Sequence, residues 1–427
     1  MKSLLNQLRP AGVLLAATIP IAACDETLEG GAACPALCPE PVADVQVDTV
    51  FAVALDSMIG GFPPLGTEAE FALTFRADTL ETRIIARYDS LPFTYKHVNV
   101  PEDSTIVSVD SAMIKLRVSK SDTLGPPITV EIYNVDVDVA GEDTAVALLA
   151  PLFVPERLIG SRTFTGTELK DSLRIPIDNA FLLDKILQPE DSLRRMRLGI
   201  RATSTQSADI HVFSSNFGGA APLLYFRASP DTQNVPALQM GPVSLTPDND
   251  AIAADLADFQ IVAVGPADPS PNVLRIGGSP GRRVYMEFDI PSAVLDSSSI
   301  IRATLLMTQR PATDAPAKDD SMAVQPFRLA NSGIIEDISR ALLFISGGFD
   351  STLSVPADSA VRAFELIDIV KSWRGTDPER TPRAIALRAA NEGVNGTFVD
   401  FFSTEAPVED RPRLLLIYAP RPAPGFP

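Results

Sequence analysis

The sequence has 427 residues, which is enough for two or three domains of ordinary size. Its formal net charge of −18, from 36 Lys and Arg against 54 Asp and Glu, argues against a nucleic-acid partner, because phosphate binding needs a basic surface. Apolar residues make up 45% of the chain, which supports packed cores and excludes a chain that is disordered throughout.

The N-terminal segment has the pattern of an export signal. Lys2 and Arg9 precede an uncharged, mostly apolar run at 11–23, whose 13 residues are too few to cross a bilayer. This run ends in Ile-Ala-Ala before Cys24, which resembles the lipobox of bacterial lipoproteins. The resemblance implies a signal peptide over 1–23 and a lipid-anchored, extracytoplasmic protein of the cell envelope, with the choice of inner or outer membrane open. The alternative is an ordinary secreted protein with a chance cysteine at the cleavage site.

The cysteine count agrees with lipidation of Cys24. Three cysteines are an odd number for an exported chain, and a lipid on Cys24 leaves Cys34 and Cys38 as a pair. An oxidising compartment would allow this pair to form a disulfide. Two thiols do not make a metal site without further His or Cys ligands. Residues 24–45 are rich in Ala, Gly, Pro and acid, and we interpret them as a lipidated tether.

Beyond the tether, short alternating runs rich in β-branched residues predict strands. The best examples are Phe71–Phe75, Ile106–Val109, Met113–Val118 and Thr129–Tyr133. In the third run, Ile114, Leu116 and Val118 should face the core, and Met113, Lys115 and Arg117 the solvent. Two short helices are expected, at Phe181–Leu187 and Ala363–Trp373.

An internal repeat predicts two copies of one domain. Five segments recur in the same order: 82–89 and 282–289, 112–116 and 303–307, 198–202 and 385–389, 210–214 and 399–403, 221–225 and 411–415. We therefore expect an all-β chain of two tandem jelly-roll sandwiches, at 46–230 and 236–420, with a Pro-rich tail at 421–427.

The second copy resembles the DNRLRE-type (disaggregatase-related) β-sandwich domain over most of 270–418. The matching segments are 270–277, 282–289, 300–305, 364–366, 370–373, 385–389, 402–405, 411–414 and 417–418. The first copy is similar but lacks a counterpart of Trp373, which is expected to plug the core. The resemblance implies a jelly-roll module of secreted, multi-domain proteins, some of which are similar to carbohydrate-binding modules for acidic polysaccharide. No catalytic residues come with this family.

Catalysis is not expected from the two histidines. A Ser-His-Asp site needs a histidine placed between an acid and an activated serine. His97 lies in Phe93–Val98 with no nucleophile motif nearby, and His211 lies in a predicted strand where the repeat has Asp400. The exchange of His for Asp favours a solvent-facing position for His211. A carboxylate pair for glycoside hydrolysis stays open, because none of the 54 acids is singled out.

Two acidic clusters offer oxygen ligands of the kind Ca²⁺ prefers. One contains Asp136 and Asp138, and the other contains Asp248 and Asp250. The alternation in the first cluster also describes an outward-facing strand edge, where acids discourage edge pairing. We favour this second interpretation and expect no metal and no cofactor.

The sequence thus predicts a membrane-anchored, non-catalytic structural or interaction module. The alternative is a surface lipoprotein that binds polysaccharide, with Arg383 and Arg388 as exposed contacts for a polyanion. A polysaccharide-active enzyme is the third hypothesis. The expected partners are the membrane, through lipid on Cys24, and a polysaccharide or another envelope protein.

Overall fold

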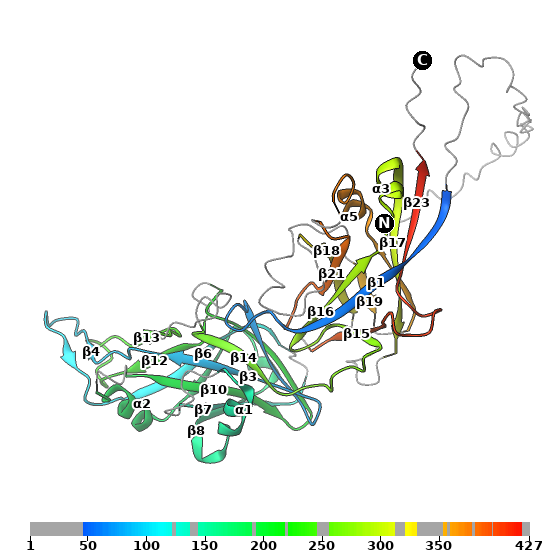
Figure 1. Ribbon diagram of the computed structural model, residues 1–427. Coiled ribbons are helices and arrows are strands. Elements are labelled where there is room, and N and C mark those ends of the chain that lie inside the picture. Colours follow the sequence, from blue (N-terminus) through cyan, green and yellow to red (C-terminus); the bar gives the residue numbers. More distant parts are fainter. Residues whose placement is uncertain are drawn as a thin grey trace, which may run out of the picture. The chain divides into compact units, whose positions relative to one another are not determined.

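The computed structural model describes residues 46–121, 125–136, 144–189, 194–217, 221–245, 256–311, 321–330, 353–356, 359–377, 381–394 and 396–420. The predicted all-β class is confirmed, because antiparallel sheets account for most of these residues (Figure 1). Cys24, Cys34 and Cys38 lie outside the described residues, as do the Pro-rich tail and Asp138, Asp248 and Asp250.

A sheet of eleven strands curls over to form what we call the first sandwich. In spatial order its strands are β13 (Leu238–Met240), β12 (Leu223–Arg227), β6 (Ser111–Ser121), β11 (Ser207–Phe213), β2 (Glu70–Arg76), β3 (Leu80–Tyr88), β10 (Met196–Ser204), β7 (Ile128–Asn134) and β8 (Leu158–Phe164), with β14 (Asp258–Val264) on β3 and β9 (Ser172–Pro176) on β6. Alternation explains the core: Ile114 and Leu116 of β6 are fully buried, whereas Arg117 is exposed. The small hairpin of β4 (Thr94–Tyr95) and β5 (Ser104–Thr105) stands apart.

A second sheet of ten strands forms the second sandwich. In the same order its strands are β1 (Gln46–Phe62), β23 (Arg413–Pro420), β17 (Ser298–Arg310), β22 (Phe398–Phe402), β15 (Val273–Gly277), β16 (Gly281–Phe288), β21 (Ala384–Ala389), β18 (Ser321–Arg328) and β19 (Leu353–Pro356), with β20 (Val361–Glu365) on β17. Trp373 is completely buried in its core, 5.9 Å from the ring of Phe288, so the predicted core role of this tryptophan is confirmed.

The helices are short, as expected. They are α1 (Val146–Leu149), η1 (Ala150–Leu152), η2 (Pro155–Arg157), η3 (Gly166–Glu168), α2 (Asn179–Ile186), α3 (Ser292–Ser297) and α5 (Ile367–Ser372). The Asp178 side chain caps α2 by accepting hydrogen bonds from the next turn. In the described part of the chain, none of these helices has the length and apolar character needed to cross a membrane.

Two local predictions were wrong. The first part of the expected helix at 363–373 belongs to β20, because Glu365 pairs with Thr304 across the sheet and tertiary pairing overrides local propensity. The expected strand at 106–109 is not formed. The strand there ends at Thr105, and Ile106 is a buried loop residue whose N–H donates to the carbonyl of Phe93.

The two sheets correspond strand for strand. The five repeated segments fall on β3 and β16, β6 and β17, β10 and β21, β11 and β22, and β12 and β23, and each strand has equivalent neighbours in its own sheet. In this correspondence β13 and β14 together take the places that β1 occupies in the second sandwich. The first part of β1 pairs with β23, as β13 pairs with β12 in the first sandwich. The second part of β1 pairs with β16, as β14 pairs with β3.

The copies have therefore exchanged their first strands. β1 comes from the first copy but pairs in the second sandwich, and β14 comes from the second copy but pairs in the first (Figure 1). Asp56 of β1 lies opposite Met286, and Asp258 of β14 lies opposite the equivalent Ala86. Each carboxylate accepts a hydrogen bond from a corresponding backbone N–H, that of Thr404 or of Ser215. The predicted boundaries at 46–230 and 236–420 therefore do not separate the sheets, because they assign each exchanged strand to its own copy.

Candidate functional site

The outer face of the first sandwich collects basic side chains on three neighbouring strands. β6 contributes Met113, Lys115 and Arg117, β9 contributes Arg174, and β12 contributes Tyr225 and Arg227, and we call this set the cationic face. Strand alternation places these residues outward, because the residues between them on β6 and β12 are in the core. The prediction that Met113, Lys115 and Arg117 face solvent is confirmed.

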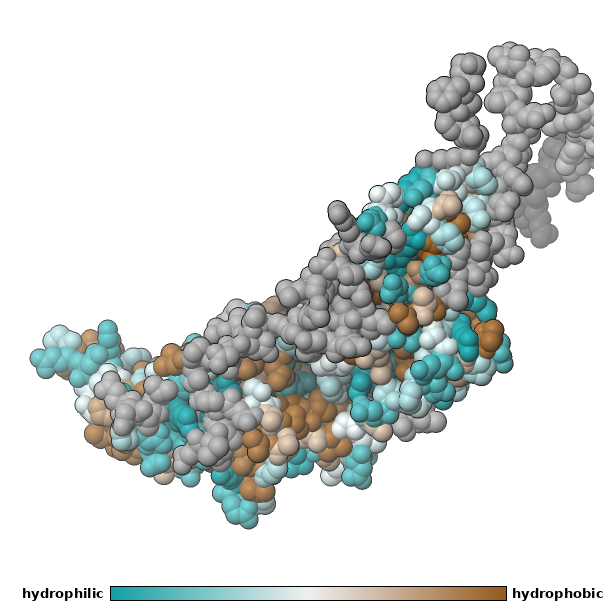
Figure 2. All heavy atoms as spheres, in the orientation of Figure 1, coloured by the Kyte–Doolittle hydropathy of each residue, from teal (hydrophilic) through white to brown (hydrophobic). Residues whose placement is uncertain are grey.

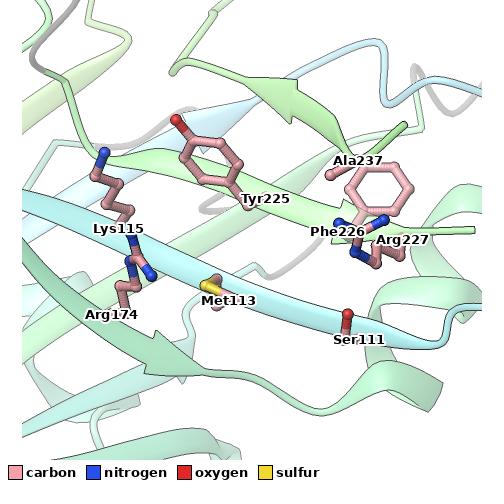
Figure 3. Close-up of a pocket in the computed structure, with 8 residues that line it drawn as sticks. All are labelled: Ser111, Met113, Lys115, Arg174, Tyr225, Phe226, Arg227 and Ala237. Atoms are coloured by element: carbon pink, nitrogen blue, oxygen red, sulfur yellow. The ribbon is translucent and has the colours of Figure 1, made fainter. Parts of the chain in front are cut away.

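The cross-strand register orders this face. Lys115 lies beside Arg174, Met113 lies beside Tyr225, and Arg227 lies beside Ser111. Lys115 and Arg174 thus stand at one end of a pocket and Arg227 at the other, with the Tyr225 ring between them (Figure 3). The pocket has a volume of about 300 Å³, and Ala237, which precedes β13, closes one side.

The four cations of this face have no carboxylate partner within the residues that the structure describes. The ammonium of Lys115 lies 5.6 Å from the centre of the Tyr225 ring, and the guanidinium of Arg117 lies 5.5 Å from that of Phe213. Arg227 donates to the carbonyl of Val235 at 3.4 Å. In a chain of net charge −18, unneutralised cations gathered on one face form a local anion-attracting surface.

The second sandwich shows that the fold does not require these cations. By register, Leu306 replaces Lys115, Ala363 replaces Arg174, Leu415 replaces Tyr225 and Ile417 replaces Arg227. Glu365 stands where Pro176 stands in the first copy, and it pairs with Arg302 at the position of Ser111. These four positions are thus apolar in the second sandwich and hold three cations and a tyrosine in the first, which is the pattern of a site added to a scaffold.

Apolar patches do not distinguish the cationic face. In Figure 2, hydrophobic residues gather over the middle of the first sandwich, with hydrophilic residues around them. The most exposed large apolar side chains, Val107 and Val408, belong to different sandwiches. Single exposed apolar residues are ordinary on protein surfaces, so charge is the distinguishing property.

The two arginines predicted as ligand contacts lie on the second sandwich, away from this face. The prediction that Arg383 is exposed was wrong: it is 7% exposed and donates to the hydroxyl of Ser292 at 2.6 Å. Arg383 lines a separate cavity of about 340 Å³ together with Glu287 and Asp289, which oppose an anion there. The composition of the sequence does not reveal this burial, because it depends on packing between segments.

Arg388 is half-buried and already engaged. Its guanidinium lies 4.3 Å from the centre of the Phe327 ring and 3.8 Å from the carboxylate of Glu392. Burial lowers the pKa of Arg388, with the nearby charge of Arg283 acting in the same direction. The structure therefore does not bring Arg383 and Arg388 together as a site.

Asp136, the one calcium candidate within the described residues, forms ion pairs instead. Its carboxylate lies 2.9 Å from the Lys185 ammonium and 3.3 Å from the Arg195 guanidinium. The interpretation of Asp136 as part of a strand edge was also wrong, because β7 ends at Asn134. No group of three or more His, Cys, Asp or Glu side chains suited to a metal occurs among the residues the structure describes.

The two histidines lie in different environments. His97 stands 4.0 Å from Asp231 in a loop. His211 was expected to face solvent but is 3% exposed, with its Nε2 3.2 Å from Asp209. Burial opposes ionisation of Asp209, but the nearby His211 holds the pKa of Asp209 below its ordinary value. The further contact of Asp209 is the hydroxyl of Thr74, so this pair is built into the sheet.

Comparisons with known proteins add little. No family model matches the chain, and no curated relative matches it. The structure of a protein from Parabacteroides distasonis, described as secreted, is 8% identical to this chain. The match covers 86% of this chain and 98% of that chain, with a TM-score of 0.23. A Macrobrachium rosenbergii nodavirus structure is 10% identical, covering 90% and 94% at a TM-score of 0.16. A subviral particle of infectious bursal disease virus is 9% identical, covering 90% and 80% at a TM-score of 0.12.

Proposed function

We propose that this protein is a lipid-anchored, non-catalytic binding protein of the cell envelope that holds an acidic polysaccharide on the cationic face. The observation that carries the proposal is the set of three cations without carboxylate partners that line the Tyr225 pocket, in an otherwise acidic chain. The anchoring rests on the lipobox-like sequence before Cys24.

The chemistry of the face suits a polymer with repeated carboxylates. Arg174 and Arg227 present planar forks that match a carboxylate in two hydrogen bonds, and Lys115 adds a compact charge. The Tyr225 ring offers a flat apolar surface for a sugar ring between them. The overall negative charge repels a polyanion at long range, so binding should depend on these local contacts and weaken with salt.

The site is tested by the triple variant K115Q/R174Q/R227Q. Each exposed charge contact contributes about 1 kcal/mol, so removing three should weaken binding about 100-fold. Affinity would be measured by calorimetry for alginate, a polyuronate, and for a neutral glucan. We expect the wild-type protein to bind alginate and not the neutral glucan, with an affinity for alginate that falls as the salt concentration is raised.

A matched control removes two arginines from the equivalent face of the second sandwich, in R302Q/R413Q. This variant removes two positive charges, against three in the triple variant, but should bind alginate as the wild type does. Equal losses in both variants would show a general charge effect. Unchanged binding in the triple variant would show that the cationic face is not the site.

The anchor is tested by C24S. Several acyl chains make membrane attachment stable, so loss of the acceptor sulfur should move the protein from the membrane pellet to the soluble fraction of a bacterial host. Incorporation of labelled fatty acid should be lost in parallel. C34S serves as the control and should stay in the pellet, and a pelleted C24S protein would refute lipidation at this residue.

A further inference from the structure

Two buried carboxyl groups meet where the exchanged strand β14 docks on the first sandwich. Asp258, the first residue of β14, is 1% exposed and accepts hydrogen bonds from the backbone N–H of Ser215, at 2.9 Å, and from the Ser215 hydroxyl. Glu68 is 7% exposed and lies in the segment that brings the chain from β1 back to the first sandwich. Glu68 therefore belongs to one crossing of the strand exchange and Asp258 to the other.

The carboxyl of Glu68 is buried and only partly hydrogen-bonded. Its Oε2 is buried and has no hydrogen-bond partner within the described residues. Burial is the largest influence and raises the pKa of Glu68 to about 8, against the opposing effect of backbone hydrogen bonds from Glu68 itself, Gln260 and Gly66. The charge of Asp258 adds to the rise. Burial likewise raises the pKa of Asp258 to about 6, against the hydrogen bonds from Ser215.

The side chains around the two acids have contacts with other groups. Tyr88 of β3 donates its hydroxyl hydrogen to the carbonyl of Pro222, and burial with the charge of Asp258 raises the pKa of this phenol. Gln260 of β14 uses its Oε1 to accept from the N–H of Ala72 and its Nε2 to donate to Ser279. The buried cation of β3, Arg87, lies 5.3 Å from the centre of the Phe259 ring.

The second sandwich has the same docking arrangement without the second acid. There Asp56 accepts from the N–H of Thr404, as Asp258 does from Ser215. The residue equivalent to Glu68 is Pro271, because Ser403 donates to the carbonyl of Asn272 as Ser214 donates to that of Ala69. Among the described residues, the docking site of β14 thus has a pair of buried carboxyl groups and that of β1 does not.

We propose that Glu68 and Asp258 form a pH-sensitive lock, which holds β14 in the first sandwich when protonated and releases it when both groups ionise. When β14 is docked, these carboxyl groups keep their protons at pH values where the same groups in an undocked chain have ionised. Docking of β14 therefore becomes weaker as the pH rises above the ordinary pKa of a carboxyl group. The change is complete above about pH 8, where the folded-state Glu68 has ionised. β1 has a single partly exposed acid at its docking site and should not respond.

The test is hydrogen exchange of the whole protein at about pH 5 and about pH 8.5, with rates corrected for intrinsic pH dependence. Amides of β14 should lose at least tenfold protection at the higher pH, whereas those of β1 stay constant. E68Q removes the larger of the two contributions, so β14 should lose much less protection between the two pH values than in the wild type. D258N should reduce the pH dependence in part and supplies an independent measurement if E68Q folds poorly.

D56N at the equivalent place in the second sandwich is the matched control, and it should leave the pH dependence of β14 unchanged. The lock is refuted if β14 and β1 lose protection together, if β14 does not respond to pH, or if E68Q and D258N both keep the wild-type response.

Discussion

Replacement of Arg197 by methionine is expected to lower the free energy of unfolding by about 3–5 kcal/mol, which is the typical cost of breaking a buried ion pair. Arg197 is 1% exposed, and its guanidinium lies 2.5 Å from the carboxylate of the fully buried Asp89. The other oxygen of Asp89 accepts from the N–H of Leu245 at 2.7 Å. Without Arg197, the carboxylate of Asp89 stays buried and keeps the hydrogen bond from the neutral N–H of Leu245. Urea denaturation followed by far-UV circular dichroism would measure the loss.

The double variant D89N/R197M separates the charge from the packing. It removes the stranded carboxylate and should recover much of the loss. The second sandwich supplies a natural precedent: Ala384 stands at the position of Arg197, and the equivalent acid, Asp289, is exposed. If R197M is as stable as the wild type, the ion pair of Arg197 with Asp89 does not stabilise the fold.

Replacement of Trp373 by alanine should lower the free energy of unfolding by about 3–5 kcal/mol, through lost transfer free energy and a cavity in the core. The ring is fully buried and tilted 40° against Phe288. Because Trp373 is the only tryptophan, unfolding would be followed by circular dichroism and not by fluorescence.

Two controls test the packing explanation. W373F keeps an aromatic ring and should lose clearly less than W373A, because Nε1 of Trp373 makes no hydrogen bond within the described residues. Leu187 follows α2 as Trp373 follows α5, but it is 51% exposed. L187A should therefore change stability by no more than about 0.5 kcal/mol. Equal losses in W373A and L187A would exclude a specific core role for the tryptophan.

Local sequence patterns predicted strands in which polar and apolar residues alternate regularly. The alternation at 113–118 gave both the strand β6 and its faces, because a strand with one buried side has a period of two residues. The same reasoning failed for 106–109, where alternating residues find no partner strand beyond Thr105. Alternation reports which side chains prefer burial, but pairing depends on residues far away in the chain.

The strand exchange could not be predicted, because the two docking positions are chemically alike. β1 and β14 have an aspartate at equivalent places and corresponding hydrogen bonds to it, so a repeat alone does not tell which strand fills which position. The cationic face was only half visible in the sequence. Lys115 and Arg117 stood out on β6, but Arg174 and Arg227 join them through cross-strand register.

The exchange also determines how the molecule would carry a mechanical load. Tension applied at residue 46 enters through β1 and is borne first by the hydrogen bonds of β1 to β23 and β16 in the second sandwich. The force then passes along the chain to β2, whose neighbour β3 is paired with a strand of the other copy. Neither sandwich can be unfolded without removing a strand that pairs in the other sandwich. The two sandwiches should therefore unfold together in one step and not one after the other.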